Sequence, residues 1–260
     1  MIANWWRNRR RRRLLARPIP DGWEIILREN VRQFAHLSPR ERERLLDVTR
    51  ILVAEKYWEG CNGLKLTDEI RVTIAGQAGL MLLGWDGRYF DHLKSILVYP
   101  DTYLAPERDV LPGGVVSESF GVRLGEAWQQ GPVILSWANV NRKDNPGEPG
   151  QNVVLHEFAH VLDNTDETFN GTPLLRSDEQ YATWRDVMTA EFHHLQRDAR
   201  DGRQSLLDQY GAQNEAEFFA VAAESFFEQP GALRTRHERL YRLLCDYYGR
   251  DPASGGALTD

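Results

Sequence analysis

The chain has 260 residues, of which 42% are hydrophobic and 27% are charged, and its formal net charge is -6. This composition is typical of a globular protein with a core of its own, and it excludes a collagen, a coiled coil and a wholly disordered chain. No run of about 18 apolar residues is present, so we expect no membrane-spanning helix.

The first 20 residues form a basic segment. It carries seven arginines, five of them consecutive at 9–13, and no acidic residue, whereas the rest of the chain is acidic. Such a segment can contact anionic lipid or nucleic acid, but a charged terminus is more often solvated and poorly ordered. We therefore predict a flexible basic arm over 1–20 and no direct nucleic-acid binding by the acidic domain that follows.

Two features favour the cytoplasm. No apolar stretch follows the arginines, which argues against a secretory signal. The two cysteines, Cys61 and Cys245, form neither a CxxC pair nor a disulfide framework, as expected in a reducing compartment.

The first half of the chain is mostly helical by pattern. Apolar residues at helical spacing predict a helix over 23–34. Ser38, Pro39 and Glu41 then read as the start of a second helix, with Ser38 as N-cap, and we expect that helix to run to about Gly60. A third helix, rich in alanine and leucine, is predicted over 67–83.

Strands are predicted in the middle and helices again toward the end. Short strands are expected at 96–99 and 133–137, and a strand pair at 115–124. The remaining predicted segments are a loop over 143–150, helices over 151–162, 181–198, 214–227 and 232–248, a loop over 163–180, and a disordered tail over 251–260. This α+β pattern predicts a single domain over 21–250.

The strongest chemical signal is an H-E-x-x-H motif formed by His156, Glu157 and His160. Residues four apart lie on one helix face, so both imidazoles can bind one Zn²⁺ ion, with Glu157 close enough to take a proton from water. The alternative is a pair of core histidines satisfied by other partners. The flanking residues are apolar, and burying these polar groups without a ligand would be costly.

A catalytic zinc site needs a third protein ligand. Asp163 lies on the same helix face as the histidines and is a candidate acceptor for a ligand imidazole, or merely a polar residue at the helix end. Glu217 and Glu224, seven residues apart on one predicted helix, can supply a ligand and an orienting group. Two alternatives stay open: Asn214 and Glu217 as a capping box, or Glu224 in an ion pair with an arginine. Spacing alone does not choose between the glutamates.

These residues resemble those of a known family. The catalytic motif continues to Asp163, and together with Tyr210 and segments 125–137, 216–220 and 224–227 it is similar to the MtfA-like (Mlc titration factor A) zinc peptidases of bacteria. The similar region extends over 23–248, and the catalytic half more distantly resembles the protease domain of anthrax lethal factor. In both groups a tyrosine precedes the third ligand by seven residues.

The resemblance implies a ligand set and a fold. It implies that Glu217 is the third metal ligand and that Glu224 is an orienting group. It also implies that Tyr210 donates a hydrogen bond to the developing oxyanion. The implied fold is α+β: a mostly helical zincin-like, gluzincin-like metallopeptidase with a small central mixed sheet and the H-E-x-x-H motif on its active-site helix. We predict an N-terminal helical part over 21–111 and a catalytic part over 112–250.

The resemblance also implies an activity. We expect one Zn²⁺ per chain and hydrolysis of short peptides, of the aminopeptidase type, with an extended substrate beside the strand at 133–137. It implies a second role in glucose-responsive gene expression, through binding of a transcription repressor. Segment 164–173 lacks the basic run expected of the family, which leaves the substrate preference open.

Other classes of function compete with this hypothesis. The protein can be a non-catalytic regulator that binds the repressor, or a metal-holding protein without hydrolase activity. Glu157 argues against metal storage, which has no use for a general base. A serine hydrolase or nucleotide-binding enzyme has little support, because no G-x-S-x-G, P-loop or GxGxxG motif is present.

Overall fold

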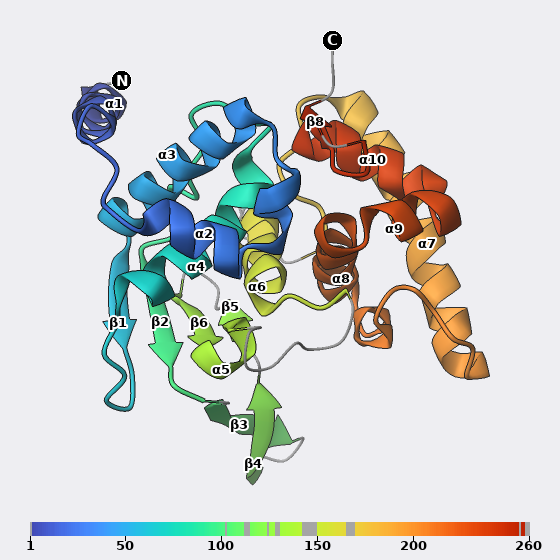
Figure 1. Ribbon diagram of the computed structural model, residues 1–260. Coiled ribbons are helices and arrows are strands. Elements are labelled where there is room, and N and C mark those ends of the chain that lie inside the picture. The colour runs from blue at the N-terminus through green and yellow to red at the C-terminus, as the bar shows by residue number, and fades with distance from the viewer. Residues whose placement is uncertain are drawn as a thin grey trace.

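A computed structural model describes residues 2–101, 103–111, 115–123, 125–127, 131–141, 150–164, 170–254 and 256–257. The small sheet lies at the lower left of the ribbon view, with the N-terminal helices above it and the C-terminal helices to the right (Figure 1). The helix over 153–163 lies between the sheet and the C-terminal helices. The α+β architecture with a small central mixed sheet is therefore confirmed. The predicted loop at 143–149 lies outside the described residues.

The N-terminal part is helical, as predicted. The capping box at Ser38 is confirmed: its hydroxyl accepts from the Glu41 backbone, and the Glu41 side chain accepts from the Ser38 backbone. The prediction was wrong at the other end of this helix, because the chain turns into a strand after Lys56. The elements are α1 (Ile2–Leu15), α2 (Trp23–Asn30), η1 (Arg32–His36), α3 (Pro39–Glu55), α4 (Asp68–Gly79) and η2 (Leu80–Leu82).

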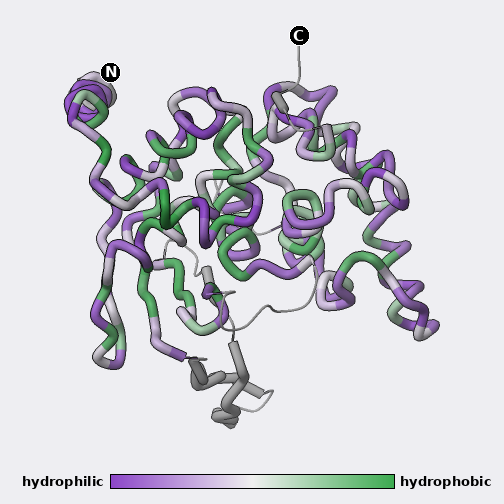
Figure 2. The backbone as a smooth tube through the Cα atoms, in the orientation of Figure 1, coloured by the Kyte–Doolittle hydropathy of each residue, from purple (hydrophilic) through white to green (hydrophobic). Residues whose placement is uncertain are grey.

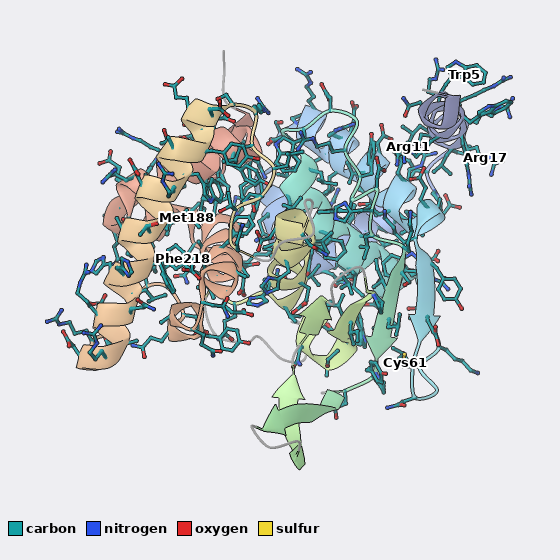
Figure 3. The ribbon with its side chains drawn as sticks, turned by 180° about the vertical axis from the view of Figure 1, so that it is seen from behind. Trp5, Arg11, Arg17, Cys61, Met188 and Phe218 are labelled. Carbon is teal, nitrogen blue, oxygen red and sulfur yellow. The ribbon has the colours of Figure 1, made fainter. Side chains whose placement is uncertain are left out.

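The basic segment differs from the flexible arm that the sequence predicts, because most of it forms α1. The acidic body supplies partners for it. Arg11 of α1 is buried, and its guanidinium lies 2.6 Å from the Glu55 carboxylate and also bonds Asp91 (Figure 3). Arg50 of α3 donates hydrogen bonds to the backbone carbonyls of Leu14 and Arg17. These contacts hold α1 against α3.

The central sheet has the strand order β1-β2-β6-β5. The first three strands are parallel, and β5 runs antiparallel to β6. A separate hairpin pairs β3 with β4. The segment at 115–124, predicted as a pair of strands, is thus one strand, and its partner is the preceding segment 103–111. The strands are β1 (Tyr57–Gly60), β2 (Ser95–Tyr99), β3 (Tyr103–Leu111), β4 (Val115–Arg123), β5 (Gly125–Ala127) and β6 (Val133–Ser136).

The expectation that the strand at 133–137 pairs with an extended substrate was wrong. Strand β6 is internal, because β2 occupies one side of it and β5 the other. Alternating apolar residues reveal a strand but not its place in the sheet. The edge strand beside β6 is β5, and the helix that carries the H-E-x-x-H motif packs against both of them.

The C-terminal half is a group of helices. The helix predicted over 232–248 is two helices that break at His237, whose backbone has φ -134° and ψ 57°. Among the described helices, none is both long and apolar enough to cross a membrane. The elements are α5 (Trp137–Val140), α6 (Val153–Asp163), α7 (Asp178–Asp201), η4 (Gln209–Ala212), α8 (Glu215–Glu228), α9 (Pro230–Arg236) and α10 (Glu238–Tyr248). Strands β7 (Arg250–Asp251) and β8 (Gly256–Ala257) pair beyond them, where a disordered tail was expected.

Aromatic side chains join these helices into one core. Phe218 of α8 packs against Phe192 of α7, with ring centroids 5.7 Å apart, and the side-chain view shows Phe218 at this junction (Figure 3). Trp184 of α7 meets Phe219 of α8 and Tyr247 of α10. Hydrophobic residues gather along the helices in the middle of the molecule, with hydrophilic ones outside (Figure 2). This packing makes α8 a rigid support for polar groups placed on it.

Lys56 makes the stability of this core depend on pH. Its ammonium is buried and donates to the carbonyls of Phe90 and Leu93, and burial lowers the pKa of Lys56 from 10.5 to about 8. Between these two values the unfolded chain holds more protons than the folded one, so stability rises with pH across this window.

We therefore expect the free energy of unfolding of the wild type to increase relative to Lys56→Met between about pH 7.5 and about pH 9.5. Urea unfolding of both proteins at each pH measures this difference. Loss of the two hydrogen bonds lowers the stability of Lys56→Met at both pH values and does not produce the pH dependence. An unchanged difference between the proteins would contradict the assigned shift.

Candidate metal centre

Helix α6 presents two histidines on one face. Its N-terminus is fixed by Asn152, whose side-chain oxygen accepts from the backbone N–H groups of Val154 and Leu155, each at 3.1 Å. The apolar residues of α6 are buried in the core, so the helix cannot rotate without exposing them. His156 and His160, one turn apart, therefore lie on a fixed face with their rings 4.9 Å apart.

Helix α8 brings a carboxylate to this face, and the two helices lie side by side (Figure 1). Asn214 is the N-cap of α8, as the capping-box alternative requires, and its side chain accepts from the Glu217 backbone at 3.0 Å. The carboxylate of Glu217 turns away from the cap, however, and approaches the histidines. Glu217 thus supplies its backbone N–H to the cap and its side chain to the site.

Three donor atoms converge. The Nε2 atom of His156 lies 3.0 Å from Glu217 Oε2 and 3.3 Å from His160 Nε2, and His160 Nε2 lies 3.5 Å from the same carboxylate oxygen. Ligand atoms about 2.0–2.2 Å from one tetrahedral zinc are separated by about 3.4 Å, which is the spacing seen here. Two imidazole nitrogens and one carboxylate oxygen in this arrangement fit a divalent metal ion.

The electrostatics of the site favour a cation. Burial opposes ionisation of Glu217, but hydrogen bonds with His156 and His160 outweigh it and hold the pKa of Glu217 at about 2. Burial also opposes protonation of His156, yet the carboxylates of Glu217 and Glu224 raise the pKa of His156 well above its usual value. The carboxylates therefore concentrate negative potential where the imidazoles meet, and a metal cation bound there would take the place of a proton.

Glu224 contacts the His156 ring at Nδ1, the nitrogen that faces away from Glu217. One of its carboxylate oxygens lies 2.7 Å from His156 Nδ1, and the other accepts from the backbone N–H of Asn152. This contact fixes the imidazole so that Nε2 points toward Glu217 and His160. Among the residues that the structure describes, Glu224 pairs with His156 and with no arginine, so these residues do not support the alternative of an arginine ion pair.

This arrangement predicts the effect of removing the negative charge behind His156. We expect Glu224→Gln to weaken metal binding about 10–100-fold, because an orienting partner raises the basicity of its histidine without touching the metal. Competition of the purified protein with a chromophoric chelator measures the affinity. Glu215→Gln, the same change at an exposed position of α8, should leave it unaltered. Equal affinities for Glu224→Gln and the wild type would contradict an orienting role.

Glu157 is the buried acid beside the donor atoms. Its side chain is 2% exposed, and its Oε2 atom has no hydrogen-bond partner within the described part of the chain. Burial raises the pKa of Glu157 to about 7, with Glu217 and Glu224 adding to the shift and the two histidines opposing it. A carboxyl group with a pKa near neutrality can both accept and release a proton, although a nearby cation would lower this pKa.

Tyr210 lies beside the histidines on η4. Its ring centroid is 6.0 Å from that of His156, and the side chain is 49% exposed. Asp208 fixes this segment, because its carboxylate accepts from the Tyr210 backbone at 2.9 Å and from the Gln151 side chain at 2.7 Å. The tyrosine therefore lies at the open side of the site, on a segment tied to Gln151, two residues before α6.

The sequence as a whole matches a family model described as glucose-regulated metallo-peptidase M90, over residues 4–249. The chain belongs to this metallopeptidase family. The resemblance to the MtfA-like peptidases stated from the sequence motifs is thereby confirmed.

The sequence similarity to individual relatives covers most of the chain of this metallopeptidase. An uncharacterized protein of Synechocystis is 36% identical over 95% of this chain and 90% of its own length. The Mlc titration factor A of Klebsiella pneumoniae is 31% identical over 88% of this chain and 86% of its own. The Mlc titration factor A of Yersinia pestis is 29% identical over 95% of this chain and 89% of its own length. Such coverage places both the N-terminal helices and the half that carries the candidate metal centre within the family.

In the metallopeptidase, Asp163 contacts the backbone at Gly171, whereas a contact with a ligand imidazole was expected. Its buried carboxylate accepts from the backbone N–H of Gly171 at 2.9 Å, whereas the Nδ1 atom of His160 has no hydrogen-bond partner within the described residues. Gly171 has φ +71°, and a Cβ there would lie 2.3 Å from the Glu215 carbonyl. Asp163 thus fastens a tight turn against the start of α8.

Two residues important for the site escaped sequence reasoning. Asn152 donates its backbone N–H to Glu224 and its side-chain amide to Glu228 at 2.8 Å, so it ties α6 to α8. Asp208 positions the backbone at Tyr210, as described above. An Asn before an apolar helix and an Asp two residues before a turn residue are both capping signals, and these could have identified the pair.

Proposed function

We propose that the protein is a zinc-dependent peptidase whose metal is held by His156, His160 and Glu217. The observation that carries the proposal is the convergence of these three donors beside Glu157, a buried carboxyl group whose pKa is raised toward neutrality. A regulator that only held a metal would need the donors but not the acid next to them.

The chain supplies the groups that peptide hydrolysis needs. Bound zinc would act as a Lewis acid toward the peptide carbonyl and make water nucleophilic near neutral pH. Glu157 accepts the proton of the attacking water and later delivers it to the leaving amine. Tyr210, on the exposed side of His156, donates a hydrogen bond to the oxyanion of the tetrahedral intermediate. Glu224 keeps the His156 ring in position throughout.

The proposed substrates are short peptides cleaved from their amino end. Family membership supports a metallopeptidase, and the aminopeptidase type is what the motif resemblance implies. An extended peptide can pair with a sheet edge, and edge strand β5 packs against α6, the helix that carries the site. We place the activity in the cytoplasm, where free Cys61 and Cys245 would stay reduced.

A second candidate function is regulation by protein binding. The relatives from Klebsiella pneumoniae and Yersinia pestis bear the name Mlc titration factor A, and the family model is described as glucose-regulated. We propose that this chain also binds a glucose-responsive transcription repressor and that such binding can occur without catalysis. The purely regulatory alternative predicts that the repressor binds equally well to the wild type and to a protein without its metal.

Paired chromogenic peptides test the peptidase proposal. A substrate with a free amino terminus should be hydrolysed, its N-acetylated counterpart should not, and a chelator should abolish the activity until Zn²⁺ is restored. Cleavage of both substrates would support a peptidase but contradict the aminopeptidase type. Cleavage of neither by protein with a filled metal centre would contradict the peptidase proposal and favour the regulatory one.

A further inference from the structure

A second group of potential metal ligands lies outside the proposed active site. It comprises Glu191 and His194 of α7 and His237 at the break between α9 and α10, and we call it the α7 cluster. Each residue offers one donor atom, and these atoms lie within 4.8 Å of one another. Helix α7 packs against α10 and runs alongside it in the ribbon view (Figure 1).

The local fold explains why these residues meet. Glu191 and His194 are three residues apart and share one face of α7. His237 is at once the C-cap of α9 and the N-cap of α10, and its backbone N–H bonds the Leu233 carbonyl at 2.8 Å. The break at this residue brings its ring to α7, where His237 Nδ1 lies 2.8 Å from Glu191 Oε2.

The donor distances are those of a metal site. His194 Nδ1 lies 3.9 Å from the same oxygen of Glu191, and the two imidazole rings are 5.9 Å apart between centroids. Donors about 2.0–2.2 Å from one zinc are about 3.4 Å apart, and the two measured separations lie on either side of this value. Small side-chain adjustments would therefore bring the donors onto one ion.

A carboxylate stands behind one of these histidines, as Glu224 stands behind His156. Asp198, four residues after His194 on the same helix face, has its Oδ2 atom 3.5 Å from His194 Nε2. The His194 ring therefore lies between two carboxylates, with Nδ1 toward Glu191 and Nε2 toward Asp198. A carboxylate behind an imidazole is the usual companion of a metal-binding histidine.

Burial suggests which ions can enter. The side chains of Glu191 and His237 are 17% and 10% exposed, whereas that of His194 is 49% exposed. One side of the cluster is thus open to solvent, so water can complete the coordination of an ion. Two imidazoles and a single carboxylate suit zinc and similar transition metals, whereas calcium and magnesium prefer sites made of oxygen ligands.

We propose that the α7 cluster is a second binding site for a divalent transition metal such as Zn²⁺, which would join α7 to the α9–α10 junction. The site shares no residue with the proposed active site and does not depend on the proposed peptidase function. Because Gln196 of α7 also donates to the Ala212 carbonyl on η4, the same helix contacts the segment that carries Tyr210.

Zinc titration of the full-length chain tests this proposal. In a His156→Ala/His160→Ala protein, whose folding is checked by circular dichroism, calorimetry should detect one Zn²⁺ per chain. Adding His194→Ala should weaken this binding at least about tenfold. His193→Ala is the matched control, because His193 is the neighbouring exposed histidine and its Nδ1 atom lies 3.2 Å from the Gln196 side chain instead of the cluster. It should leave zinc binding unchanged.

Three results would overturn the proposal: no zinc bound by the folded double variant, undiminished binding after His194→Ala, or an equal loss after His193→Ala. If the double variant does not fold, the wild type provides the test instead. It should bind two zinc ions where His194→Ala binds one. A single ion in the wild type, unaffected by His194→Ala, would then refute the second site.

Discussion

Replacing Glu157 by Gln is expected to lower kcat/KM for peptide hydrolysis by about 10²–10⁴-fold, the usual contribution of a general acid–base. The amide keeps the size of the side chain but cannot accept a proton from water. The three donor atoms belong to His156, His160 and Glu217, so the metal should remain bound. Folding stability should not fall, because a buried carboxyl group is exchanged for a neutral amide of similar shape.

Steady-state kinetics together with metal analysis measure both halves of this prediction. Glu215→Gln is the matched control, since Glu215 is exposed at the start of α8 and its substitution changes the net charge by the same amount. Undiminished hydrolysis by Glu157→Gln would show that another group handles the proton. Loss of the metal from this variant would mean that Glu157 helps to bind the metal, contrary to the proposed division of roles.

Replacing Glu217 by Ala is expected to weaken zinc binding at the proposed active site by more than about 100-fold, since loss of an orienting partner alone costs about 10–100-fold. The variant leaves two histidines on α6 without the carboxylate from α8. Competition with a chromophoric chelator measures the effect, in a His194→Ala background so that zinc at the α7 cluster does not contribute.

The order of the glutamate variants is the sharper part of this prediction. Glu217→Ala should lose more affinity than Glu224→Ala, and Glu215→Ala should match its parent. The reverse order would make Glu224 the ligand, and His156 would then bind the metal through Nδ1, the nitrogen that now faces Glu224.

Much of the candidate site follows from local sequence rules. Helical spacing alone places His156 and His160 on one face, and it places Glu217 and Glu224 together on α8. The caps at Ser38 and Asn214 are equally local, because each joins atoms three residues apart. The choice between the two glutamates came from the family resemblance, since it depends on how α8 docks on α6.

The features that sequence reasoning missed depend on contacts distant in the chain. Tyr57 continues the helical pattern of α3 but becomes part of β1, because pairing with β2 competes successfully with local helix formation. The arginine-rich segment is helical and held by Glu55 and Asp91, residues far from Arg11 in the sequence. The break at His237 accompanies a contact with Glu191 of another helix, which no local pattern reveals.

We propose that His156, His160 and Glu217 hold zinc beside Glu157. The most direct test of this proposal is a crystal structure of the zinc-loaded protein with anomalous diffraction recorded on both sides of the zinc absorption edge. We predict a zinc peak bonded to the Nε2 atoms of both histidines and to the Glu217 carboxylate, with Glu157 beside it. Absence of zinc from these three residues, or coordination by Glu224 in place of Glu217, would contradict it.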